Sequence, residues 1–231
     1  MKRILITGSN RGLGLEFTRQ YLESGWRVYA TCRRPAEADS LRMLCDIHCS
    51  LSIHRLDITR QEDISSLCHE LRDISLNILI NNAGVYFRKR NEGVECIHYG
   101  DWQRTLEVNT LGTVRVTEAL LRNIEKSEDT GLVVVISNQV GGIVDIDGLA
   151  DMYYRSSKAA LNAAMQGVAV ALLPKNVGVL LLHPGGVMTR MGPTKGISKR
   201  ESVDGMRQVI ETFSMDKSGA FFTYDGHEMQ W

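Results

Sequence analysis

The sequence lacks an excess of either charge. Its 231 residues include 27 Lys and Arg and 27 Asp and Glu, so the formal net charge is zero. A protein that binds nucleic acid or an anionic membrane surface through its overall charge usually carries a basic excess. We therefore expect no nucleic-acid partner and no membrane partner.

Long hydrophobic runs are missing as well. The most apolar stretch, residues 159–173, is interrupted by Asn162 and Gln166. It is also shorter than the roughly 20 residues that a membrane-spanning helix needs. The amino terminus enters a short apolar run directly and has no signal-peptide pattern. These features predict a cytoplasmic protein.

Metal-site and hydrolase motifs are also absent. The five cysteines form an odd set, which suits reduced thiols better than a disulfide framework. Cys45, His48 and Cys49 are close in sequence, but no second cluster completes a four-ligand zinc site, so we expect no metal. There is neither a Gly-x-Ser-x-Gly elbow nor a zinc-binding helix motif, which argues against a hydrolase.

The strongest pattern that is present lies at the amino terminus. An apolar run at 4–6 is followed by a glycine-rich turn and an amphipathic segment at 15–22, which predicts a strand, a turn and a helix. Glycine lets the backbone approach a pyrophosphate, and the free N–H groups at a helix start favour an anion. The expected phosphate-binding residues are Gly8, Ser9, Asn10, Arg11, Gly12, Leu13 and Gly14. A tight turn that binds nothing is the alternative.

The same alternation of strand and helix continues along the chain. Strands are expected at 4–6, 26–31, 50–55, 77–80, 131–136, 177–182 and 220–223, and helices at 15–22, 36–46, 60–72, 101–126, 151–173 and 201–213. This order predicts an α/β fold: a single Rossmann-like domain over 1–231, with a doubly wound parallel sheet of about seven strands and helices on both faces. Ligands of such folds bind at the carboxyl ends of the strands.

Two strand ends carry residues that suit an adenosine moiety. Dinucleotide-binding folds recognise the adenosine ribose after the second strand, by a carboxylate on the 2′-OH or an arginine on a 2′-phosphate. Arg33 and Arg34 stand there, so we expect NADP(H) to be preferred over NAD(H); solvated loop charges are the alternative. Asp57, followed by Ile58, ends the third strand, where its carboxylate is expected to accept from the adenine amine or to cap the next helix.

Three further features place polar groups where they need a ligand or a hydrogen-bond partner. Asn82, Ala83 and Gly84 follow the fourth strand, and such short residues let the chain pass close to a ligand. Asn109 falls among apolar neighbours in an expected helix, where it is expected to bend the helix or hold a water. Tyr154 and Lys158 are four residues apart and share a helix face, so the ammonium can reach the phenol.

Taken in order, these motifs resemble the short-chain dehydrogenase/reductase family. They are Thr7-Gly8-x-x-x-Gly12-x-Gly14, Asn81-Asn82-Ala83-Gly84, Asn109, Tyr154-x-x-x-Lys158 and Pro184-Gly185-x-x-x-Thr189. The carboxyl-terminal part, with Glu201-Ser202-Val203 and Tyr224-Asp225-Gly226, resembles the C-factor-like, sniffer-type carbonyl reductase branch of that family.

The resemblance implies an NADPH-dependent oxidoreductase that transfers hydride between the nicotinamide and a carbonyl or alcohol substrate. Tyr154 would be the general acid and base, and Lys158 would lower its pKa and hold the nicotinamide ribose. Asn109 would keep a water for proton relay. The segment with Pro184, Gly185, Val187 and Thr189 would contact the nicotinamide end of the cofactor, and a homodimer is expected.

One position departs from the family pattern. The serine that orients the substrate usually follows the fifth strand, and Asn138 stands at its place. Ser137 comes one residue earlier and would face the opposite side of an extended strand. Two outcomes remain open: a reductase that uses Asn138 or a shifted Ser137, and an NADP(H)-binding regulatory or signalling protein with weak or no turnover.

Overall fold

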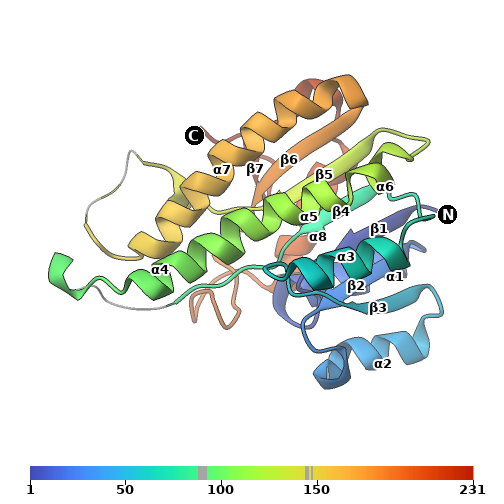
Figure 1. Cartoon of the computed structure of the whole chain (residues 1–231), viewed down its shortest axis with the longest axis horizontal. Coiled ribbons are helices and arrows are strands. Elements are labelled where there is room, and N and C mark those ends of the chain that lie inside the picture. The colour runs from blue at the N-terminus through green and yellow to red at the C-terminus, as the bar shows by residue number, and fades with distance from the viewer. Residues whose placement is uncertain (88–92, 144–145, 147, 231) are drawn as a thin grey trace.

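A seven-stranded parallel sheet organises the molecule (Figure 1). The computed structural model describes residues 1–87, 93–143, 146 and 148–230. The strand order is β3-β2-β1-β4-β5-β6-β7, and every neighbouring pair runs parallel. This is the Rossmann-like α/β fold that the alternation of strands and helices predicts.

The elements follow the expected ranges closely. The strands are β1 (Arg3–Ile6), β2 (Arg27–Cys32), β3 (Leu51–Arg55), β4 (Ile78–Asn81), β5 (Gly131–Ile136), β6 (Val177–His183) and β7 (Phe221–Thr223). The α-helices are α1 (Gly12–Glu23), α2 (Asp39–Ile47), α3 (Gln61–Glu70), α4 (Tyr99–Leu106), α5 (Thr113–Ala119), α6 (Leu121–Glu125), α7 (Met152–Leu172) and α8 (Lys199–Glu211). Short 3₁₀ turns are η1 (Pro35–Glu37), η2 (Val94–Cys96), η4 (Gln139–Gly141), η5 (Leu173–Lys175) and η6 (Met215–Lys217).

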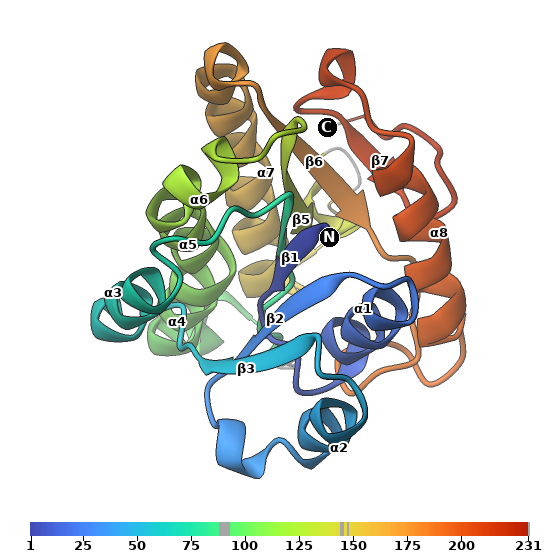
Figure 2. The same cartoon turned by 90° about the vertical axis from the view of Figure 1, so that its right-hand side faces the viewer.

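Two cores form because alternate side chains of each strand point to opposite faces of the sheet. On one face, Leu5 and Val133 belong to the core that includes residues of α3, α5 and α7. On the other face, Ile4 and Val134 belong to the core that includes residues of α1, α2 and α8. Figure 2 shows the sheet between these two layers of helices.

The expected long helix over 101–126 is not continuous. Helix α4 passes into a π-helical segment, η3 (Glu107–Gly112), and then into α5; α6 follows as a separate short helix. Single π-helical turns inside α-helices are rare and frequently mark functional sites. Asn109 lies within this segment, so its position does distort the helix, as expected.

The described part of the chain also bears on membranes and metals. Within the described ranges, no helix is both long enough and apolar enough to traverse a bilayer. Across the same residues, no group of three or more His, Cys, Asp or Glu side chains is placed to hold a metal ion. Cys45 instead donates a weak hydrogen bond to the Leu51 carbonyl.

Candidate active site

The candidate site lies where the strand order reverses. Strands β1 and β4 are neighbours in the sheet, although β2 and β3 separate them in the chain. In open α/β sheets a ligand binds beyond the carboxyl ends of the strands at such a switch point. The glycine turn after β1 and the segment Asn82 to Gly84 after β4 both lie there.

The glycine turn has the backbone that its sequence predicts. Gly8 and Gly12 adopt φ values of 68° and 61°, in the left-handed region that favours glycine. A Cβ atom built on Gly12 would meet no other atom within 4 Å, so the backbone there borders open space. Helix α1 begins at this residue, has no side-chain cap and has no acidic residue in its first turn. Its first N–H groups therefore suit a phosphate.

The turn is fastened directly to the end of β4. The Thr7 hydroxyl oxygen accepts hydrogen bonds from the backbone N–H groups of Asn82 and Ala83, each at 3.0 Å. The Asn82 side-chain amide donates to the Thr7 carbonyl at 2.8 Å. A Cβ on Gly14 would lie 2.4 Å from the Gly8 carbonyl oxygen. The motif therefore works by close backbone contact, and Thr7, which the sequence analysis did not count as a site residue, is its anchor.

The other loop residues divide into inward-facing and outward-facing groups. Ser9 is buried, and its hydroxyl donates to the Ile6 carbonyl at 2.8 Å. Leu13 packs against the core below α1. Arg11 is exposed, and Asn10 is partly exposed. Ser9 and Leu13 thus shape the turn from within, while Asn10 and Arg11 border the space in front of it.

The basic residues after β2 lie on the surface. Arg33 and Arg34 are both exposed, and Arg34 forms an ion pair with Glu37 at 3.1 Å. The charge of Arg33 favours the ionised form of Asp57, which follows the neighbouring strand β3. The two strand ends that suit the adenosine moiety are therefore close together.

Asp57 closes a local turn. Its carboxylate accepts from the Thr59 backbone N–H at 3.0 Å and from the Thr59 hydroxyl at 2.7 Å. Burial opposes its ionisation, but these hydrogen bonds outweigh burial and the pKa of Asp57 lies below its usual value. The alternative expectation of a helix cap is wrong, because α3 begins at Gln61 and its cap position is Arg60. The next residue, Ile58, is buried against the π-helical segment.

Asn109 pins the chain after β4. Its side-chain oxygen accepts from the Val85 backbone N–H at 2.8 Å, and its amide donates to the Val85 carbonyl at 2.9 Å. The same amide donates to the Ser157 hydroxyl at 3.0 Å. Every polar atom of the buried amide thus has a partner in the protein, and Ser157, on α7, is a contact that no local sequence signal marked. A relay water would have to use other atoms.

Lys158 is buried beside the tyrosine. Only 5% of it is exposed, and its ammonium donates to the Ile136 carbonyl at the end of β5, at 2.8 Å. The ammonium nitrogen lies 5.7 Å from the centre of the Tyr154 ring. Burial lowers the pKa of Lys158 to about 8, which leaves the side chain cationic at neutral pH.

Tyr154 holds its proton tightly. Burial raises the pKa of Tyr154 to about 12; a hydrogen bond with the Asn138 side chain opposes the shift, and Tyr86 and the Asp151 carboxylate add to it. The expectation that Lys158 brings this pKa down is therefore not met, because burial dominates and the ammonium is engaged by the Ile136 carbonyl. At neutral pH the group is a phenol.

Asn138 and Ser137 face different neighbours, as the alternation of a strand requires. The Asn138 carbonyl oxygen accepts from the Val140 backbone N–H at 3.1 Å, so its amide is left to donate to the Tyr154 phenol. Ser137 is buried, and its hydroxyl donates to the Asn162 side-chain oxygen at 2.5 Å. The structure therefore brings Asn138, Tyr154 and Lys158 together and turns Ser137 away from them.

The segment after β6 forms an opposing wall. Gly185 adopts a φ of 79°, and the Pro184 carbonyl accepts from the Ser202 hydroxyl at 2.6 Å. Val187 is buried and bridges to Ile197. The Thr189 hydroxyl oxygen accepts from the Gly192 backbone N–H at 3.0 Å and remains able to donate.

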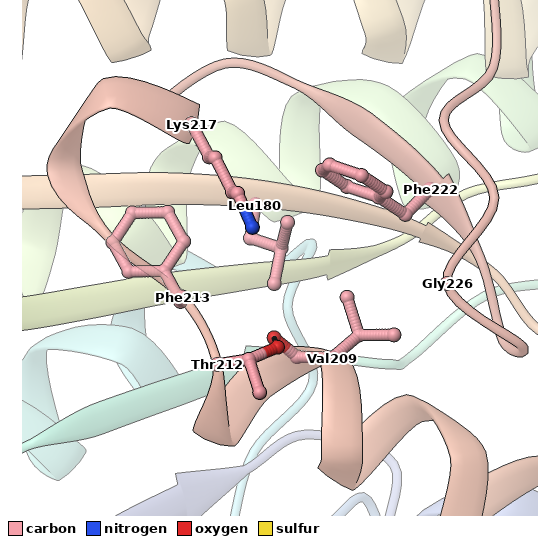
Figure 3. A pocket seen from close by; sticks show the side chains of 7 residues that line it. All are labelled: Leu180, Val209, Thr212, Phe213, Lys217, Phe222 and Gly226. Carbon is pink, nitrogen blue, oxygen red and sulfur yellow. Dashed lines mark hydrogen bonds between the residues drawn. The ribbon is translucent and has the colours of Figure 1, made fainter.

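Two cavities lie away from this constellation. One of about 290 Å³ flanks Met152, Ser156 and Ala159 of α7. On a helix these residues share a face that differs from the face of Tyr154 and Lys158. The other, of about 60 Å³, lies between β6, β7 and α8 (Figure 3) and is too small for a substrate. Neither is lined by Tyr154, Lys158 or Asn138.

The comparisons with known proteins agree with this geometry. The model of the short chain dehydrogenase family matches residues 2–199. The C-signal protein of Myxococcus xanthus is 38% identical over 161 residues, which cover 68% of this chain and 93% of that protein. Because the family model spans most of the chain, these matches establish the family.

Solved structures of two carbonyl reductases are also similar. The NADPH-bound carbonyl reductase from chicken fatty liver gives a TM-score of 0.91 at 30% identity and covers 100% of this chain and 99% of that one. The carbonyl reductase Sniffer of D. melanogaster gives 0.90 at 28% identity and covers 100% of both. With a dinucleotide frame at the switch point and Tyr154 beside Lys158, the chain belongs to the short-chain dehydrogenase/reductase family and is an NAD(P)-dependent oxidoreductase of the C-factor-like, sniffer-type branch.

Proposed function

We propose that the protein is an NADPH-dependent carbonyl reductase in which Tyr154 is the general acid. The observation that carries this proposal is the environment of its phenol: protonated at neutral pH, hydrogen-bonded to Asn138 and next to the buried cation of Lys158. A carbonyl oxygen that gains electrons needs a proton donor of this kind. The NADPH-bound chicken reductase supports the choice of cofactor.

The residues present fit a dinucleotide. The open space before Gly12 and the uncapped start of α1 suit the pyrophosphate, and Asp57 with the exposed Arg33 suits the adenosine end. Asn82, Ala83 and Gly84 would line its underside. Pro184, Gly185, Val187 and Thr189 would hold the nicotinamide end, where the Thr189 hydroxyl can donate to a carboxamide. When bound, this cofactor supplies the hydride.

The chain's own groups would manage the proton. The Tyr154 phenol would donate to the carbonyl oxygen of the substrate while the Asn138 amide keeps the phenol in place. The phenolate left behind would be stabilised by the Asn138 N–H group, which lowers the pKa of Tyr154. The buried ammonium of Lys158 would add a positive charge near the ring. Asn109 would act by fixing Val85 and Ser157 around the tyrosine, and its role in a proton relay stays a prediction.

The remaining expectations are part of the same proposal. We propose a cytoplasmic homodimer with a small-molecule carbonyl or alcohol as its partner. The outer face of α7 supports a dimer, since Ala163, Gly167 and Val170 are exposed. Light scattering at micromolar concentration would test it. An NADP(H)-binding regulator without turnover is the weaker candidate, because the Asn138 amide can donate to the phenol as a serine hydroxyl could.

The test is a pair of hydroxyl deletions on adjacent residues. Tyr154→Phe should lower kcat/KM for carbonyl reduction by about 10²- to 10⁴-fold, the usual contribution of a general acid, with NADPH affinity retained. Tyr153→Phe is the matched control, because it removes a hydroxyl from the neighbouring residue of the same helix, where the hydroxyl accepts from the His98 backbone N–H. Steady-state NADPH consumption with a panel of aldehydes, ketones and diketones measures both. A wild type that turns over none of the panel, or a Tyr154→Phe variant with full activity, contradicts the proposal.

A further inference from the structure

Two residues from distant parts of the chain meet beside Tyr154. Tyr86 lies in the segment after β4, and Asp151 lies immediately before α7. The Tyr86 hydroxyl donates to the Asp151 carboxylate at 2.5 Å. The ring of Tyr86 packs against the ring of Tyr154, with centroids 5.0 Å apart and planes inclined at 56°. Tyr86 and Asp151 therefore form one wall of the space next to the phenol.

Asp151 is held in an unusual conformation. Its φ of 58° places it in the left-handed region, which few residues other than glycine adopt. Its carbonyl accepts from the Arg155 backbone N–H at 2.8 Å, so it opens helix α7. A carboxylate at a helix start is stabilised by the helix dipole. A strained position that persists in a fold points to a constraint, and here it aims a carboxylate at Tyr86.

The charge of this wall reaches the phenol. The Asp151 carboxylate raises the pKa of Tyr154, as a nearby negative charge does. Two further groups lie near Tyr154: the Asn138 amide, which is neutral, and the Lys158 ammonium, which is buried and donates to the Ile136 carbonyl. A second anion placed at the same spot would be repelled by the carboxylate.

We propose that Tyr86 and Asp151 are a specificity-determining pair: their wall carries a fixed negative charge and selects neutral carbonyl substrates over those with an anionic group next to the reacting carbon. This inference rests on the proposed reductase function. Tyr86 supplies the apolar surface and holds the carboxylate in place, while Asp151 supplies the charge. Neutral aldehydes, ketones and diketones are the favoured class, and 2-oxo acids are disfavoured.

The experiment compares two substrates of nearly equal size. Benzoylformate carries a carboxylate beside its ketone, and benzoylformamide carries a neutral amide at the same place. In low-salt buffer with saturating NADPH, the wild type should show kcat/KM for the amide at least tenfold above that for the acid. Asp151→Asn should narrow this ratio by about fivefold to tenfold, as expected for one charge several ångströms away. Asp151→Glu should keep the ratio.

Three controls separate charge from damage to the fold. Asp129→Asn removes an exposed carboxylate just before β5, at the end of that strand opposite to Ile136. It should leave the amide-to-acid ratio of kcat/KM unchanged. Tyr86→Phe keeps the ring and the charge but releases the carboxylate from its hydrogen bond, so the preference for the amide should weaken by less than in Asp151→Asn. In the wild type, raising the salt from 0.02 to 0.5 M should narrow the ratio, because salt screens partly exposed charges.

The outcomes bear on the pair and on the reductase separately. An unchanged amide-to-acid ratio of kcat/KM in a folded Asp151→Asn variant overturns the inference. If that variant does not fold, a wild-type ratio that does not change with salt concentration overturns it instead. If the wild type reduces neither compound nor any other carbonyl, the proposed function fails. The pair is then judged by calorimetric binding of the two compounds to the NADPH complex, where equal affinities would overturn it.

Discussion

The two halves of the site are built by different means. On the cofactor side, backbone meets backbone: Thr7, Asn82 and the glycines bring β1, α1 and the end of β4 into direct contact. On the substrate side, helix α7 and the end of β6 carry three ionisable side chains, Tyr154, Lys158 and His183, whose pKa values are shifted by burial. The first half depends on close backbone approach at its glycines and on two short polar side chains, and the second depends on the electrostatic environment of its ionisable groups.

After the loss of the Tyr154 hydroxyl, the largest effect is expected where the cofactor half is tightest. Gly14→Ala would place a Cβ 2.4 Å from the Gly8 carbonyl oxygen, so the turn must widen. We expect a loss of stability of about 1–3 kcal/mol, typical of overpacking. NADPH affinity should fall by tenfold or more.

Gly100→Ala in the first turn of α4 is the matched control. No atom lies within 4 Å of the added methyl group, and alanine should stabilise the helix by about 1 kcal/mol. Thermal unfolding and fluorescence titration with NADPH measure both variants. A Gly14→Ala variant that binds NADPH like the wild type would show that the close contact is dispensable.

The substrate half should make the fold sensitive to acid. Burial lowers the pKa of His183 to about 4, although the charge of Asp225 opposes the shift. The Nδ1 atom of His183 accepts from the Gln139 backbone N–H at 3.4 Å. Between about pH 6.5 and 4 the unfolded chain binds a proton that the folded chain excludes, so stability falls as pH falls.

From pH 7 to pH 5 this one group should cost about 2 kcal/mol of unfolding free energy. His183→Asn should remove that part of the pH dependence, whereas His227→Asn, on the exposed carboxyl-terminal turn, should leave it in place. Urea unfolding at the two pH values provides the measurement. If the unfolding free energies of wild type and His183→Asn depend on pH in the same way, groups other than His183 cause the acid sensitivity.

A moderate effect is expected from the adenosine end of the cofactor half. Arg33→Asp should weaken NADPH binding by about tenfold and leave NADH binding almost unchanged, because only the 2′-phosphate is repelled. Arg34→Asp should weaken NADPH binding less than Arg33→Asp does, since Arg34 already forms an ion pair with Glu37. Titration of both cofactors against both variants is the measurement. A wild type that binds NADPH and NADH equally would refute the predicted preference.

The smallest effect is expected at the position that departs from the family pattern. Asn138→Ala should lower kcat/KM by about tenfold, because the phenol loses a hydrogen bond of ordinary strength. Asn138→Ser should stay within about threefold of the wild type, since a hydroxyl can replace the amide as a donor. A large gain in turnover for Asn138→Ser would instead mean that the asparagine suppresses the reaction.

The sequence predicted most of the fold because its signals are local. Buried parallel strands are short apolar runs, and the glycines mark the turn that follows β1. Tyr154 and Lys158 were placed on one helix face by their spacing alone. The pKa values of these two groups were not predictable in the same way, because they depend on burial that the neighbouring sequence does not encode.

The features that sequence reasoning missed all depend on contacts between distant segments. The partners of Asn109 are Val85 and Ser157, and Asp57 caps its own turn instead of the next helix. Tyr86 and Asp151 are 65 residues apart and share no motif. Thr7 was visible beside Gly8, but its hydroxyl gained its role only when β4 was placed next to β1.

The π-helical segment has a consequence for how this chain tolerates change. Its wider turn accommodates about one residue more than an α-helical turn, so the two arms of the interrupted helix are out of phase by about 100°. One arm presents Trp102 to Ser156 on α7, and the other presents Thr117 to Asn81 at the end of β4. Deleting a single residue between 107 and 112 would bring the two arms back into phase and move either Trp102 or Thr117 away from its hydrogen-bond partner. This stretch should therefore tolerate insertions and deletions less well than an ordinary surface helix.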